Sequence, residues 1–140
     1  MQIILDSQNK SVVRIEKGEE FLSVLKSVAQ KKDLSCNFSM IGACREVELS
    51  YFDVATKKYF KKVFNMGNIE MVSVNGNVTW FEGEPMIHAH GVFSDEEYKC
   101  FGGHIAKLII SITGEVVIDW LPSKINKKVD KETGLKFLSA

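Results

Sequence analysis

Three histidines are the residues of this sequence whose types and spacing best suit chemistry. His88 and His90 stand two positions apart in Met86–Phe93, an apolar segment typical of a β-strand. Because side chains alternate along a strand, both imidazoles project from the same face, close enough to share one ion. The third histidine, His104, follows the Gly102–Gly103 pair. Two glycines suit a tight backbone approach that returns the chain beside the first strand.

This constellation predicts a site for a divalent transition metal, with zinc as the first choice. Imidazole is a common zinc ligand, and three protein ligands leave a fourth position for water or a substrate atom. An all-histidine set also suits other divalent metals, so the metal's identity stays open. The alternatives are polar residues on a solvated strand face, or a hydrogen-bonded core histidine. The expected metal ligands are His88, His90 and His104.

Two other residues have both a chemical and a structural interpretation. Cys100 precedes His104 by four positions and would complete a tetrahedral set, but the loop at residues 95–99 is expected to turn it elsewhere. Glu115 begins the last strand, where it either supports a ligating histidine or is exposed at a turn. We expect the structural interpretation for both.

One helix and many strands must position these side chains. Apolar residues recur at helical spacing between Phe21 and Ala29, which predicts a helix over residues 19–31 with Glu19 and Glu20 in its first turn. The strand candidates are residues 3–5, 12–15, 36–44, 47–51, 59–64, 69–74, 78–81, 86–93, 105–112 and 116–120. Asn75–Gly76 is the strongest hairpin turn signal.

These elements predict an α+β fold, a mainly antiparallel or mixed β-sheet with one main helix packed on it. A single helix cannot cover both faces of a sheet this large. We expect self-association to cover the remaining face or the sheet edges.

Length and composition bound the function classes. The 140 residues are 45% hydrophobic and 26% charged, which is typical of a globular protein and excludes disordered and collagen-like chains. The 18 Lys and Arg residues balance the 18 Asp and Glu residues, and this neutrality weakens a nucleic-acid-binding role. Residues 1–122 are expected to form one domain, followed by a lysine-rich tail at residues 123–140 that either packs back or is disordered.

Two features bear on nucleic acid and on nucleophilic catalysis. The run Lys57–Lys62 interleaves four lysines with two aromatic residues, which is typical of a nucleic-acid patch or of an edge strand protected by lysines. We expect the edge strand. A serine hydrolase is not predicted, because the sequence lacks the Gly-x-Ser-x-Gly motif.

Cysteine usage and the N-terminal segment indicate a compartment. Cys36, Cys44 and Cys100 are odd in number and form no Cys-x-x-Cys pair. The first residues show no signal-peptide pattern, and no apolar stretch is long enough to cross a bilayer. We therefore expect reduced thiols and a cytoplasmic protein, with Cys36 and Cys44 buried as small apolar residues.

Three segments taken together resemble the plants and prokaryotes conserved family, called PPC or PCC. They are residues 67–77, residues 85–90 and Gly102–His104, in that order. The resemblance implies a mixed sheet with one helix, assembled as a homotrimer, and a divalent metal, zinc by family analogy, at His88, His90 and His104. Prokaryotic members are often labelled predicted DNA-binding proteins. Plant members contact DNA largely through Arg-Gly-Arg segments, which this sequence lacks.

Three functional hypotheses follow. The first is a trimeric metal-binding module with a regulatory role. The second is a metal-dependent, hydrolase-like enzyme with an open zinc site and Glu115 or Glu70 as the base. The third is a DNA-binding protein that uses the lysine run and the tail on a trimer. No membrane partner is expected.

Overall fold

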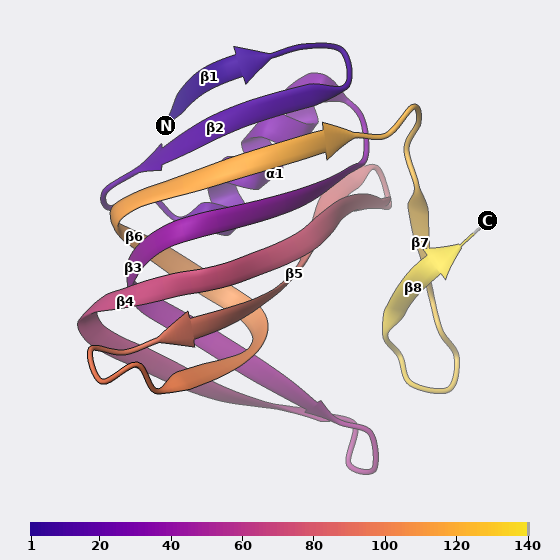
Figure 1. Ribbon diagram of the computed structural model, residues 1–140. Helices are drawn as coiled ribbons and strands as arrows, with labels where there is room; N and C mark the ends of the chain where they lie inside the picture. The colour runs from indigo at the N-terminus through magenta and orange to yellow at the C-terminus, as the bar shows by residue number, and fades with distance from the viewer. Residues whose placement is uncertain (140) are drawn as a thin grey trace.

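The computed structural model describes residues 1–139, which form one helix and eight strands (Figure 1). In chain order these are β1 (Gln2–Asp6), β2 (Lys10–Glu16), α1 (Phe21–Lys32), β3 (Cys36–Asp53), β4 (Lys58–Phe81), β5 (Glu84–Ser94), β6 (Cys100–Trp120), β7 (Asn126–Val129) and β8 (Lys136–Ser139). Among these residues, no helix is long and apolar enough to span a membrane.

The strands join in one sheet in the order β1-β2-β6-β3-β4-β7-β8, and β5 pairs with both β4 and β6. Consequently β3, β4, β5 and β6 form a closed ring, because each pairs with the next and β6 returns to β3. All pairings are antiparallel except that of β4 with β7. A mainly antiparallel sheet with one helix confirms the predicted fold class.

Three strands are much longer than predicted, because most of the predicted breaks are irregularities in the register of continuous strands. Register shifts interrupt the β3–β4 ladder after Met40 and Cys44 without ending it. Strand β4 continues through residues 66–68, which have no partner on β3. A bulge of this kind bends a strand while keeping the ladder on both sides, so separate predicted segments merge into β3, β4 and β6.

The predicted hairpin turn at Asn75–Gly76 is wrong. Gly76 lies inside β4 opposite Ala89, and a Cβ atom there would lie 2.1 Å from the His88 carbonyl oxygen. The glycine therefore permits close strand packing rather than a turn. The actual turn between β4 and β5 is Glu82–Gly83, whose φ angles of 52° and 83° are the positive pair that type I′ hairpins require.

Helix α1 begins at Phe21, two positions later than predicted. Glu20 is its N-cap, and the Glu20 carboxylate accepts hydrogen bonds from the backbone N–H groups of Leu22 and Ser23. Glu19 and Glu20 therefore lie before the first turn rather than in it. The helix ends at Lys32, because Asp33 adopts a left-handed conformation with φ of 58°.

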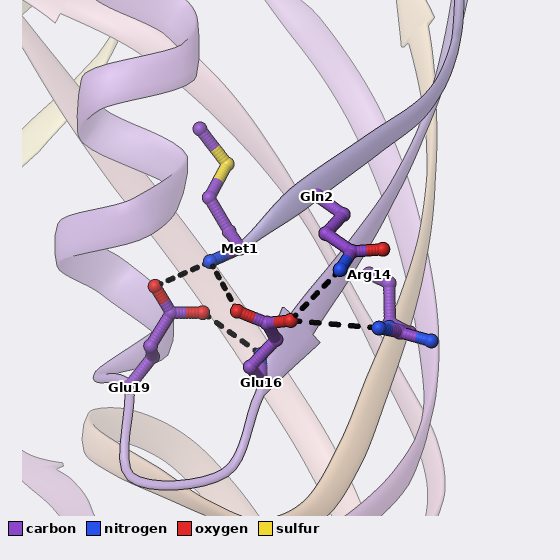
Figure 2. A network of polar contacts seen from close by, with 5 residues as sticks. All are labelled: Met1, Gln2, Arg14, Glu16 and Glu19. Carbon is purple, nitrogen blue, oxygen red and sulfur yellow. Dashed lines mark hydrogen bonds and ion pairs between the residues drawn. The ribbon is translucent and has the colours of Figure 1, made fainter.

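Polar contacts of the N-terminal amine hold β1 beside the start of α1 (Figure 2). The amine of Met1 lies 2.6 Å from a carboxylate oxygen of Glu19 and 3.2 Å from one of Glu16. The second Glu19 oxygen accepts a hydrogen bond from the backbone N–H of Glu16. Glu19 thus acts as a bridge between the chain end and the turn that enters the helix.

The helix covers one face of the sheet, behind β2, β6 and β3 in the view of Figure 1. Its buried residues are Phe21, Val24, Leu25, Val28 and Ala29. The Phe21 ring packs edge-on against Phe38 of β3, with centroids 5.6 Å apart. Cys36 and Cys44 belong to the same core and are free thiols, as predicted.

Residues after Pro122 form a hairpin that extends the sheet. Strand β7 lies parallel to the end of β4, where the backbone N–H of Trp80 donates to the Ile125 carbonyl oxygen at 2.9 Å. The ammonium of Lys124 lies 3.9 Å from the centroid of the Trp80 ring. These contacts place the β7–β8 hairpin beside the ring of strands (Figure 1).

Candidate metal centre

The three histidines converge where β5 meets β6. His90 and His104 are directly opposite in the antiparallel register. His88 lies two residues before His90 on β5, so its side chain is on the same face of the strand. The approach is tight, because a Cβ atom on Gly102 would lie 2.5 Å from the Gly91 carbonyl oxygen. Gly102 therefore permits the close approach of β6 to β5 that the sequence predicts, whereas a Cβ atom on Gly103 would meet its nearest neighbours only at 3.8 Å.

The three imidazoles face one another. The ring centroids are 5.1 Å apart for His88 and His90, 5.2 Å for His88 and His104, and 5.3 Å for His90 and His104. The Nε2 atoms of His88 and His90 are 3.2 Å apart, and one ring nitrogen from each histidine lies within 4.8 Å of the others. Ligands about 2.05 Å from a tetrahedral zinc ion are separated by about 3.4 Å, so small ring rotations would suffice.

The surroundings favour the neutral form of the His88 and His104 imidazoles. Burial, followed by the positive charges of Lys127 and the other two histidines, lowers the pKa of His88 to about 4. Burial and the charges of His90 and Lys127 also lower the pKa of His104. A neutral imidazole offers a free lone pair, so the donor set fits a divalent transition metal.

A pocket of about 580 Å³ opens beside the histidines. Its other walls come from the far ends of β3 and β4 and from the C-terminal hairpin. The aromatic and aliphatic residues that line it there include Tyr51, Phe52, Tyr59, Phe137 and Leu138. A group bound at the histidines would therefore face an open and partly apolar pocket.

Lys127 of β7 is a pocket residue that the sequence did not reveal. Its side chain is only 8% exposed, although it lines the pocket. In the sequence it is one of several lysines in a polar tail, and no motif distinguishes it from Lys124, Lys128 or Lys131. Only the fold of the β7–β8 hairpin places it near the histidines.

Cys100, Glu115 and Glu70 lie outside this site. Cys100 is exposed, and its sulfur is 3.9 Å from the Tyr98 carbonyl oxygen. Glu115 lies opposite Arg14 on β2, and Glu70 lies opposite Ser94 on β5. Neither glutamate lines the histidine pocket. The structural interpretation of Cys100 and Glu115 is confirmed, and within one chain neither glutamate named in the enzyme hypothesis lies beside the histidines.

The run Lys57–Lys62 begins an edge strand, as predicted. This part of β4 pairs with β3, and its other side has no strand partner within residues 1–139. Lys61 forms an ion pair with Glu48 at 2.7 Å. Lys62 lies over the Phe64 ring at 4.7 Å from its centroid. Two lysines of the run therefore already interact with side chains of the sheet.

Solved structures with this fold come from several prokaryotes. A plant- and prokaryote-conserved protein from Pyrococcus horikoshii is 27% identical, with 99% of this chain and 95% of that chain covered and a TM-score of 0.85. A protein from Ralstonia eutropha that is named as a candidate DNA-binding protein is 27% identical, with 93% and 90% covered and a TM-score of 0.87.

A third structure, the metal-containing protein from Archaeoglobus fulgidus, shares the fold at lower identity. It is 21% identical, with 100% of this chain and 99% of that chain covered and a TM-score of 0.85. No curated protein sequence matches this chain. The model of the Plants and Prokaryotes Conserved (PCC) domain matches residues 5–122, which include all three histidines. The chain therefore belongs to the PCC domain family.

Proposed function

We propose that this PCC domain protein is a metal-binding module, with zinc held by His88, His90 and His104. The observation that carries the proposal is the convergence of three imidazole nitrogens within 4.8 Å on two paired strands. The lowered pKa values of His88 and His104 support it, because zinc then competes with few protons at neutral pH. The name of the Archaeoglobus fulgidus structure adds support from a protein of the same fold.

Metal analysis of protein without a histidine tag tests this proposal. After treatment with chelator and addition of zinc, we expect about one equivalent per chain by plasma mass spectrometry. His88→Ala and His104→Ala should each bind much less zinc, whereas Cys100→Ser should bind as the unmodified protein does, because Cys100 is exposed and lies outside the cluster. Less than about a tenth of an equivalent in the unmodified protein would refute the metal centre.

We also propose that the module assembles as a homotrimer through its uncovered sheet face. Met40 is buried in the same core as the apolar residues of α1, so by strand alternation its neighbour Ile41 points to the opposite face, where it is 57% exposed. Val72 and Ile112 are exposed by 52% and 64%. Apolar side chains in such positions are typical of a contact between subunits.

Sedimentation equilibrium tests the trimer. The unmodified protein should have three times the mass of one chain, and Ile41→Glu should lower it by placing a charge in the contact. Val54→Glu is the matched control and should leave the mass unchanged, because Val54 is also an exposed apolar residue, at 69%, but lies in the turn between β3 and β4 rather than on the sheet face. A monomer in the unmodified protein would contradict the proposal.

DNA binding is the second candidate, favoured by the name of the 27% identical Ralstonia eutropha protein. On a trimer, three copies of the edge strand that begins at Lys58 would act together. A gel shift at low salt should weaken steeply as salt is added and should weaken further in a Lys58→Ala and Lys62→Ala double variant. The absence of any shift at micromolar protein would exclude this candidate.

A further inference from the structure

Among residues 1–139, the side chains that line the pocket beside the histidines include positive groups and no negative ones. Lys127 and Lys136 line it together with the three histidines, and none of its lining residues is Asp or Glu. The Lys136 ammonium already has a cation–π partner, because it lies 4.0 Å from the centroid of the Phe81 ring. The charge that is left without a partner therefore belongs to Lys127.

Lys127 is a buried lysine whose ammonium has no carboxylate partner among residues 1–139. Its side chain is 8% exposed, and no carboxylate within residues 1–139 forms an ion pair or hydrogen bond with it. Burial and the nearby charge of Lys136 lower its pKa. Burying an unpaired charge costs free energy, and a ligand that brings a negative charge would recover part of this cost.

A second polar atom at the pocket also lacks a partner. The side-chain oxygen of Asn77, which lies opposite His88 in the register, is buried and accepts no hydrogen bond from the described residues. Asn77 lines the same pocket. Buried acceptors are nearly always satisfied in folded proteins, so the pocket wall carries a second polar atom whose partner the described residues do not supply.

The opposite wall would accept an apolar group. Tyr51 and Tyr59 are 70% and 52% exposed, and Phe137 and Leu138 are 49% and 61% exposed, although all four line the pocket. A volume of about 580 Å³ has room for a small molecule. An inorganic anion alone would leave these side chains uncovered, whereas an organic acid with an apolar substituent would cover them.

We propose that this pocket binds a small organic carboxylate, with the carboxylate between Lys127 and the histidine cluster and the apolar part against Tyr51 and Phe137. The inference deepens the proposed function, because zinc at the histidines would be the second positive partner of the anion. Lys127 lies beyond residue 122, where the match to the PCC domain ends. The C-terminal hairpin of this chain therefore determines the ligand class.

Calorimetric titration with phenylacetate, phenylacetamide and inorganic phosphate tests the proposal on the zinc-treated full chain. Phenylacetate should bind, while the neutral amide of the same shape should bind at least tenfold more weakly. Lys127→Met should weaken phenylacetate binding by tenfold or more, because methionine keeps the length of the side chain and removes the charge. Lys128→Met is the matched control, since Lys128 is exposed on the same strand and does not line the pocket.

The outcomes separate the anion site from the metal centre, because zinc content is measured in parallel. If zinc binds and phenylacetate does not, or if Lys127→Met binds phenylacetate as the unmodified protein does, the carboxylate site is refuted. Tighter binding of inorganic phosphate than of phenylacetate would also overturn it. If zinc uptake fails while Lys127→Met and Lys128→Met still differ tenfold, the metal centre is wrong and the carboxylate site stands.

Discussion

At the scale of single residues, the histidines were predictable and Lys127 was not. His88 and His90 occupy a strand whose alternation is visible in the sequence, and the Gly102–Gly103 pair before His104 indicates a close approach of strands. Their meeting depends on local rules with a period of two residues. Lys127 is buried by a hairpin packed at the end of β4, a long-range contact that has no period in the sequence.

The two buried cysteines carry a prediction about pH. Burial raises the pKa of Cys36 and of Cys44 from 9.0 to about 12. In the unfolded chain these thiols lose protons above pH 9, whereas the folded protein retains them, so the free energy of unfolding should fall as pH rises from 9 towards 12. Their contribution is fully present below pH 9.

Urea denaturation at pH 8 and pH 10.5 measures this effect. The midpoint should fall more in the unmodified protein than in Cys36→Ala, which lacks one of the two groups and keeps all other titrating residues. At pH 8 a thiol reagent should modify one thiol per folded chain, at the exposed Cys100, and three after unfolding. Rapid modification of all three in the folded state would contradict the burial of Cys36 and Cys44.

At the scale of elements, the sequence predicted the type of each segment better than its length. The apolar stripe from Phe21 to Ala29 located α1 correctly, because a helix is defined by local spacing. The long strands were divided in the prediction, since a bulge and a turn use the same residues. Asn75–Gly76 shows why, because turn chemistry and close packing both select glycine.

Gly76→Ala should therefore behave as a packing defect in β4. The added Cβ atom would lie 2.1 Å from the His88 carbonyl oxygen and 2.6 Å from the Phe38 ring. We expect a loss of about 1–3 kcal/mol in the free energy of unfolding, measured by urea denaturation, together with weaker zinc uptake as β5 shifts.

Gly103→Ala is the matched control for this change. Its added Cβ atom would find its nearest neighbours at 3.8 Å, an ordinary contact, although it lies next to His104. Equal destabilisation by the two substitutions would show that the close approach at Gly76 does not explain its glycine.

At the scale of the whole molecule, a ring of four strands carries the histidines while a separate hairpin carries the lysine. The last strand of the ring ends at Trp120, and the match to the PCC domain ends two residues later, at residue 122. We propose that residues 1–122 are the unit that folds, and that the β7–β8 hairpin adds the ligand-binding wall. The α+β class followed from the pattern of elements, whereas ring closure depends on bends that the sequence does not specify.

Truncation after Pro122 tests this division. The shortened chain should unfold cooperatively and bind zinc, because it retains the core and all three histidines. It should lose phenylacetate binding, since Lys127 and Phe137 are removed. Circular dichroism, zinc analysis and calorimetry measure these three properties. A truncated chain that does not fold would show that the contacts of Trp80 with the hairpin are part of the core.

The closed ring has one short side. Five register pairs join β5 to β6, and the His90–His104 pair is the last of them, whereas every other side of the ring has a longer ladder. An ion held by histidines of both strands would link β5 to β6 at the end of this short ladder and so stabilise their pairing. Zinc should therefore slow hydrogen exchange at the amides of residues 100–104 more than at those of β1, which lies outside the ring.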